Sequence, residues 1–158
     1  MRSTLFILAA VACLSARDVS PGTEVFAGST LCGGIIRPLL NIPPEADCAL
    51  VEWKLTLYRD PVTQKPSSYK LEAVHRFVVK ATNMYSKPGT ATSAEGKWII
   101  IKGTKNDPEA IVYQLDPGIP QRQISLYKFS PDHLHVLDKN GALMIGDGSA
   151  SYTLNRIP

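Results

Sequence analysis

Along much of the chain, apolar and polar residues alternate in short runs, the pattern of β-strands that bury one face. Residues 51–57, with the sequence Val-Glu-Trp-Lys-Leu-Thr-Leu, are apolar at every second position. Residues 69–73 alternate in the same way, and residues 76–82 either extend that strand or form another. Residues 96–102 consist largely of β-branched and aromatic residues, which strands favour.

Five more short strands are expected in the C-terminal half, at residues 110–115, 124–129, 134–137, 142–145 and 151–155. Asn140-Gly141 between two apolar runs predicts a hairpin turn. About eight short strands joined by frequent turns, without a long helical segment, predict an all-β antiparallel barrel or sandwich. Sequential pairing favours an up-and-down barrel that closes on itself and so leaves no exposed strand edge.

Two stretches lack strand alternation. Residues 24–49 are expected to be irregular, with one short helical turn marked by Ile35, Ile36, Leu39 and Leu40 and limited in length by Pro38. Residues 83–95 are rich in Ser, Thr, Gly and Ala and are expected to form a mobile loop.

Residues 1–16 have the order of a secretory signal peptide: a basic residue, an apolar run at 5–12 and small residues immediately before Cys13. A cysteine at the cleavage point resembles the lipobox of bacterial lipoproteins, in which that cysteine carries a lipid anchor. We therefore expect cleavage before Cys13 and a membrane anchor on it. Residues 17–23 are expected to be a tether, and residues 24–158 a single barrel domain.

Cys32 and Cys48 form an even pair whether Cys13 is lipidated or lost with the signal. In an oxidising compartment such a pair is expected to form a disulfide. The formal net charge of +3 is spread along the chain without a basic stripe interleaved with aromatic residues. A nucleic-acid partner is therefore not expected.

His133 and His135 lie two residues apart on a predicted strand, so their side chains share a face and could form half of a zinc or copper site. The alternative is a solvent-facing row opposite a core side. Cys48 next to Asp47 could add a thiolate if it were reduced, whereas a disulfide would exclude ligation through its sulfur.

Catalytic motifs such as Gly-x-Ser-x-Gly, His-Glu-x-x-His or a glycine-rich phosphate loop do not occur in the sequence, so an enzyme is not expected. A pair of carboxylates meeting in a barrel mouth stays open as a route to glycoside hydrolysis. The aromatic residues, about one per strand, are expected to fill the core; alternatively several of them line the interior around an apolar ligand.

Several motifs together resemble the N-terminal domain of NlpE-type copper-resistance lipoproteins. They are Gly-Lys-Trp-Ile-Ile-Ile-Lys-Gly-Thr from residue 96, Ala-Ile-Val-Tyr-Gln-Leu, Leu-His-Val-Leu-Asp and Ser-Tyr-Thr-Leu-Asn-Arg, preceded by residues 44–48 and 51–57. The resemblance covers residues 44–156 and implies a small lipocalin-like barrel, lipid-anchored in the envelope and linked to copper tolerance and stress sensing. Glu45 stands where that family has the first cysteine of its Cys-x-x-Cys pair, and under this resemblance Cys32 is expected to replace that cysteine structurally.

The sequence thus predicts a non-catalytic binding or stress-sensing module of the bacterial cell envelope, in the outer membrane or periplasm, with an envelope protein as its partner. No resident cofactor is expected, and copper is the metal that the resemblance suggests. The alternative is a lipocalin-like carrier of a small apolar ligand. A third hypothesis is an envelope hydrolase.

Overall fold

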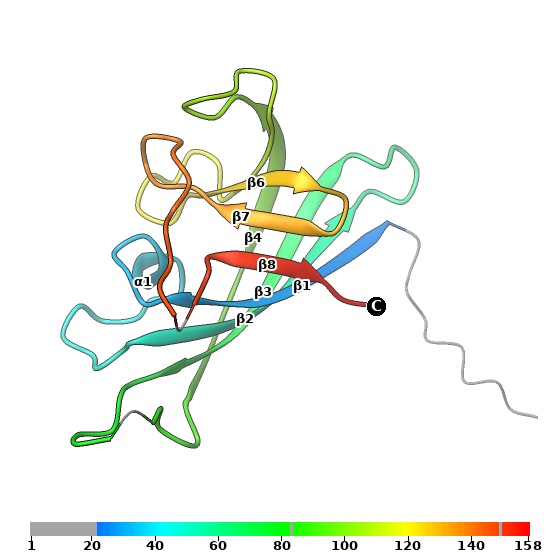
Figure 1. The fold of residues 1–158 in the computed structure, drawn as a ribbon. Coiled ribbons are helices and arrows are strands. Elements are labelled where there is room, and N and C mark those ends of the chain that lie inside the picture. Colours follow the sequence, from blue (N-terminus) through cyan, green and yellow to red (C-terminus); the bar gives the residue numbers. More distant parts are fainter. Residues whose placement is uncertain (1–21, 83, 149) are drawn as a thin grey trace, which may run out of the picture.

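Eight strands follow one another around a closed antiparallel barrel, each hydrogen-bonded to the next in sequence (Figure 1). The computed structural model describes residues 22–82, 84–148 and 150–158. The elements are β1 (Thr23–Leu31), α1 (Ile36–Leu39), β2 (Leu50–Arg59), β3 (Pro66–Arg76), β4 (Thr90–Lys102), β5 (Ile111–Leu115), β6 (Ile124–Ser130), β7 (His133–Val136) and β8 (Thr153–Arg156). The predicted all-β antiparallel barrel is confirmed.

The barrel closes because the short last strand pairs on both sides. β8 is antiparallel to β7, with Leu154 opposite Leu134, and antiparallel to β1, with Leu154 opposite Gly28. All strands therefore find two neighbours, which removes the exposed edges of an open sheet. Gly28 allows close approach at this seam, since a Cβ there would lie 2.4 Å from the Thr153 carbonyl oxygen.

Side chains at alternate positions fill the barrel interior as one continuous buried cluster. Its members include Phe26, Leu55, Leu57, Leu71, Trp98, Leu115, Leu126, Leu134 and Leu154. Five of the aromatic residues expected in the core are buried: Trp53, Tyr69, Trp98, Tyr113 and Tyr152. Tyr127, in contrast, is partly exposed.

One end of the barrel is covered by residues 32–48, which we call the plug. The plug contains α1, and Figure 1 shows it at the end opposite to the start of β1. Ile36 and Leu39 are fully buried against the interior cluster, so the predicted helical turn contributes to the core. A disulfide between Cys32 and Cys48 closes the plug at its two ends, as predicted.

The N-terminal boundary differs from the expectation. The tether predicted at 17–23 and the irregular segment predicted at 24–49 both overlap β1, which begins at Thr23. The alternation of apolar and polar residues does not predict β1, because only one of its inward-facing residues, Phe26, is large and apolar. The other inward positions hold Glu24, Gly28 and Thr30. Thr30 is buried and accepts a hydrogen bond from Trp53 Nε1 at 2.9 Å, which compensates for its polarity.

Three further segment predictions are corrected. β4 begins at Thr90, inside the segment predicted as a mobile loop, and β3 ends at Arg76, so that residues 76–82 contribute only the bridge between Val78 and Tyr85. The segment 142–145 likewise contributes one bridge, Leu137 to Leu143. The turn that precedes this segment is held by Asp138, whose Oδ1 accepts hydrogen bonds from the backbone N–H groups of Asn140 and Ala142.

In the described part of the chain, none of the helices has the length and apolar character needed to traverse a bilayer. The predicted signal peptide at 1–16, the anchor position Cys13 and the predicted tether up to residue 21 lie outside the described residues.

Candidate functional site

Four polar side chains meet at the barrel end that the plug leaves uncovered. They are Glu24 from the start of β1, Arg59 from the end of β2, Tyr113 from β5 and Lys128 from β6, and we call them the mouth cluster. In Figure 1 this is the end where β1 begins and β8 finishes. On β2 and β6 the series of inward-facing positions continues one step beyond the last apolar residue, to Arg59 and Lys128.

The contacts within the mouth cluster converge on one phenol and one carboxylate. Lys128 Nζ donates to Tyr113 Oη at 2.7 Å, and Arg59 Nη2 donates to the same oxygen at 3.3 Å. Arg59 Nη2 also pairs with Glu24 Oε2 at 3.3 Å, and Lys128 Nζ lies 3.8 Å from Glu24 Oε1. One carboxylate therefore faces two cations.

Aromatic rings form the floor beneath these cations. The Arg59 guanidinium lies 4.9 Å from the centre of the Trp98 ring, and Lys128 Nζ lies 5.1 Å from that of Tyr113. The two rings are themselves in contact, with centroids 4.8 Å apart. A ring face attracts a cation, so the floor holds both positive groups at the mouth.

The mouth cluster is only partly shielded from water. The side chains of Glu24, Arg59 and Lys128 are 15%, 19% and 23% exposed, respectively, so a small solute can reach them. The three charges sum to one excess positive charge at neutral pH. Tyr113 accepts from both cations, and among the described residues its own hydroxyl hydrogen has no protein acceptor. The arrangement is therefore suited to a single negative charge.

A second buried polar group lies deeper in the barrel wall. Asp116 is 4% exposed, accepts a hydrogen bond from Tyr69 Oη at 2.8 Å and forms an ion pair with Arg122 at 3.0 Å. Burial, followed by the hydrogen bond to Asp116 and its charge, raises the pKa of Tyr69. Gly96 leaves room for this carboxylate, since a Cβ there would lie 1.9 Å from Asp116 Oδ1. These contacts join β3, β4 and the loop after β5, and we interpret them as structural.

The two histidines share the outer face of β7, as their spacing predicts, opposite the buried Leu134 and Val136. His133 Nδ1 contacts Ser130 Oγ at 2.7 Å. Both ring nitrogens of His135 are engaged, Nδ1 with Thr153 Oγ1 and Nε2 with the Met144 carbonyl oxygen. Hydrogen bonds thus fix these rings in the wall of the barrel.

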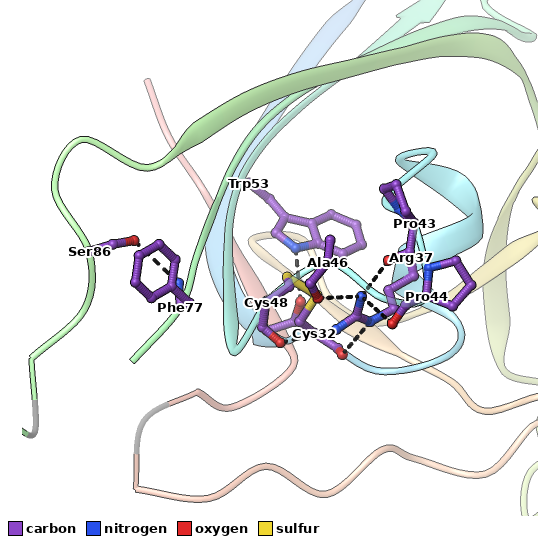
Figure 2. The surroundings of a disulfide bond; sticks show 10 residues. Cys32, Arg37, Pro43, Pro44, Ala46, Cys48, Trp53, Phe77 and Ser86 are labelled. Carbon is purple, nitrogen blue, oxygen red and sulfur yellow. Dashed lines mark hydrogen bonds between the residues drawn. A yellow bond between two sulfur atoms is a disulfide. The ribbon is translucent and has the colours of Figure 1, made fainter. Parts of the chain in front are cut away.

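Cys48 lies in the plug with its sulfur bonded to Cys32, so it presents no thiolate to a metal (Figure 2). Across the described ranges, no group of three or more His, Cys, Asp or Glu side chains is arranged to hold a metal ion. The three predicted ligands, His133, His135 and Cys48, are accordingly not brought together into such a group.

Arg37 holds the plug together from its centre. Figure 2 shows its guanidinium surrounded by backbone carbonyls of the plug. It donates to the carbonyl oxygens of Cys32, Pro43, Pro44, Ala46 and Cys48 at 2.7–3.4 Å. A charged donor thus satisfies the turn carbonyls that a segment without regular structure would otherwise leave unpaired.

Two of the surface hollows of the described structure are lined by none of the mouth cluster residues. One, of about 530 Å³, is formed by β2, β3 and β4 and is lined by Glu52, Lys54 and Glu72 among others. The other, of about 490 Å³, lies between the loops around Gln123 and Asp138.

The sequence interpretation did not identify the mouth cluster. A signal was present in two strands: Arg59 follows the inward Leu55 and Leu57 at the same spacing of two, and Lys128 follows Leu126 in that way. A charged residue that continues an inward series marks a barrel end. The alternation of apolar and polar residues does not reveal which strand ends lie next to each other in the folded barrel.

Comparison with known proteins finds no matching family model, no matching curated protein and no matching solved structure. The fold and the site therefore define the protein only as a disulfide-containing, closed antiparallel β-barrel with a plugged end and a charged mouth.

Proposed function

We propose that this protein is an exported, non-catalytic binding module of the bacterial cell envelope that binds through the mouth of its barrel. The mouth cluster carries this proposal. Two cations and one carboxylate face each other around a phenol, partly exposed, at the one barrel end that the plug does not cover. Elsewhere the interior is occupied by the protein's own side chains, so the mouth is where the barrel meets a ligand.

Export is supported by two independent features. The Cys32–Cys48 disulfide is the kind of bond that persists in oxidising compartments. Residues 1–16 have the order of a signal peptide, and the proposal includes a lipid anchor on Cys13. A stress-sensing role of the NlpE type remains part of the proposal, with an envelope protein as partner. Copper bound through Cys48 is not part of it, because the disulfide occupies that sulfur.

Fractionation of a bacterial host that expresses the full chain tests the export and the anchor. We expect the mature protein in the envelope fraction, cleaved before Cys13, with an added diacyl mass and with Cys32 and Cys48 oxidised. A Cys13→Ser variant should leave the membrane fraction and keep the disulfide. Full-length protein in the cytoplasm with free thiols would contradict the proposal.

Native mass spectrometry of the protein released from that envelope tests the binding role. We expect a co-purifying ligand that is lost when Arg59 and Lys128 are both replaced by glutamine. A matched double variant at the exposed Lys54 and Lys70, which lie on β2 and β3 away from the mouth cluster, should retain the ligand. Identical, ligand-free spectra for all three proteins would overturn binding through the mouth.

A further inference from the structure

We propose that the mouth cluster binds the carboxylate of a single-chain amphiphile, with the apolar chain lying along the rim of the barrel. This inference rests on the proposed function, since it names the ligand class of the same mouth. It is carried by three features of the site: the charge balance, an available hydroxyl donor and the apolar residues beside them.

The charge balance favours a monoanion. Arg59 and Lys128 share a single carboxylate partner, Glu24, so one further negative charge brings the partly buried group to neutrality. Bringing a dianion to the same place would replace one excess positive charge with one excess negative charge, in a location only 15–23% exposed. A carboxylate therefore fits this group better than a phosphate monoester.

The donors needed by a carboxylate are already in position. Arg59 and Lys128 point at one oxygen, Tyr113 Oη, from 3.3 and 2.7 Å. The hydroxyl hydrogen of Tyr113, a residue 1% exposed, has no protein acceptor within the described residues. A carboxylate beside Tyr113 can accept this hydrogen and charge-assisted bonds from the two cations.

The rim next to Tyr113 is apolar and exposed. Ile100 lies opposite Tyr113 in the register of β4 and β5 and is 42% exposed. Ile111 precedes Tyr113 by two residues, so it shares the same face of β5, and it is 45% exposed. An alkyl chain attached to the carboxylate can cover these two side chains, and the filled interior below them limits the chain to the rim.

Octanoate is the probe that tests this inference, by calorimetric titration of the mature protein. Acetate has the charge without the chain, and octanol has the chain without the charge. We expect octanoate to bind more tightly than either compound. The fluorescence of Trp98, which lies under Arg59, should change on binding and gives a second readout.

Three variants separate binding at the mouth from general effects. Lys128→Met, which keeps the aliphatic stem, should weaken octanoate binding about tenfold or more, or ~1.4 kcal/mol. Lys54→Met, at an exposed lysine on β2, should leave it unchanged. Glu24→Gln removes the competing carboxylate and should tighten binding, an outcome that misfolding cannot imitate. Weaker binding in Glu24→Gln, or equal affinity in Lys128→Met and the unmodified protein, would overturn the inference.

The inference and the proposed function can fail separately. If inorganic phosphate binds more tightly than octanoate and loses affinity in Lys128→Met, the ligand class is wrong and the mouth is still a binding site. If no octanoate binds while the envelope-extracted protein carries another ligand that depends on Arg59 and Lys128, the ligand class is again wrong. If neither octanoate nor a co-purifying ligand is found, both proposals are wrong.

Discussion

Buried polar residues connect parts of this barrel that are far apart in sequence. Asp116, in a left-handed backbone conformation with φ of 48°, receives a hydrogen bond from Tyr69 on β3 and pairs with Arg122 in the following loop. Arg122 Nε is buried without a partner among the described atoms, so the ion pair is its main compensation. Because these groups depend on each other, removing one leaves the others uncompensated in the wall of the barrel.

Replacing Asp116 with Asn is expected to destabilise the protein by about 2–3 kcal/mol, because Arg122 loses its countercharge while Tyr69 keeps an acceptor. Unfolding by urea, followed by fluorescence, measures the loss. Asp132→Asn, at an exposed carboxylate, is the matched control and should change stability by less than about 0.5 kcal/mol. Equal stability of both variants would mean that Asp116 contributes no more than a surface carboxylate.

The contacts between Tyr69, Asp116 and Arg122 are expected to make the stability of the fold depend on pH through the Tyr69 phenol. Its pKa in the folded protein is raised above the unfolded value, first by burial and then by Asp116. A raised pKa means that the folded state retains the phenol proton more strongly, so this contribution is complete below pH about 10 and declines as the pH rises further. Tyr69→Phe should lose about 1–2 kcal/mol at neutral pH, and its difference from the unmodified protein should shrink above pH about 10. A constant difference measured by urea unfolding across that range would refute this assignment.

At the scale of elements, strands are predictable where one face is apolar and fail to be recognised where it is not. The strong alternation of residues 51–57 corresponds to most of β2, and the β-branched run at 96–102 to the second half of β4. β1 has inward glycine, threonine and glutamate, so its pairing with β2 and β8 depends on backbone hydrogen bonds and on residues of the partner strands. Local pattern cannot reveal a strand whose stability comes from its neighbours.

The disulfide was predictable from its cysteine pair, but the mouth cluster was not. Cys32 and Cys48 are close in sequence and form the pair that remains when Cys13 is set aside, and such a pair is expected to bond in an oxidising compartment. Glu24, Arg59, Tyr113 and Lys128 come from four strands. Their contacts depend on how far each strand runs before it turns, and sequence patterns specify element ends poorly.

The plug is held by a covalent bond and by a cation at once. Cys32–Cys48 fixes its two ends across a separation of 16 residues, while Arg37 binds carbonyl oxygens between them. Replacing Cys32 or Cys48 with Ser should therefore lower stability by about 2–4 kcal/mol under oxidising conditions, since it frees the loop in the unfolded state.

Thermal and urea unfolding with and without reductant provide the control for that prediction. Reductant should destabilise the unmodified protein to about the level of the serine variants and leave the variants themselves unchanged. Unchanged stability of Cys32→Ser under oxidising conditions would show that Arg37 and the buried side chains of α1 hold the plug without the bond.

At the scale of the whole molecule, the up-and-down barrel has a plug at one end and the mouth cluster at the other. Successive strands run in opposite directions, and the connections β2–β3 and β6–β7 lie at the end where β1 begins, opposite to α1 (Figure 1). The buried Ile36 and Leu39 of the plug pack against the interior at one end, and the partly buried charges of the mouth cluster lie at the other. This arrangement depends on the barrel being closed, and closure depends on the short pairings of β8 with β7 and with β1.

The pairing between β1 and β8 leaves no room for an added methyl group at Gly28. Three residue pairs join these strands, and Gly28 lies opposite Leu154 in the last of them. A Cβ at Gly28 would lie 2.4 Å from the Thr153 carbonyl oxygen and 2.9 Å from Leu154 Cδ2, so Gly28→Ala must push β8 away. We expect a loss of about 2–4 kcal/mol and, because the edges of β1 and β7 become exposed, concentration-dependent self-association. Gly34→Ala, where no atom lies within 4 Å of the added Cβ, is the matched control and should stay monomeric and stable. Urea unfolding measures the stability of both variants, and sedimentation measures their oligomeric state. A monomeric Gly28→Ala variant of unchanged stability would show that β8 is dispensable for closing the barrel.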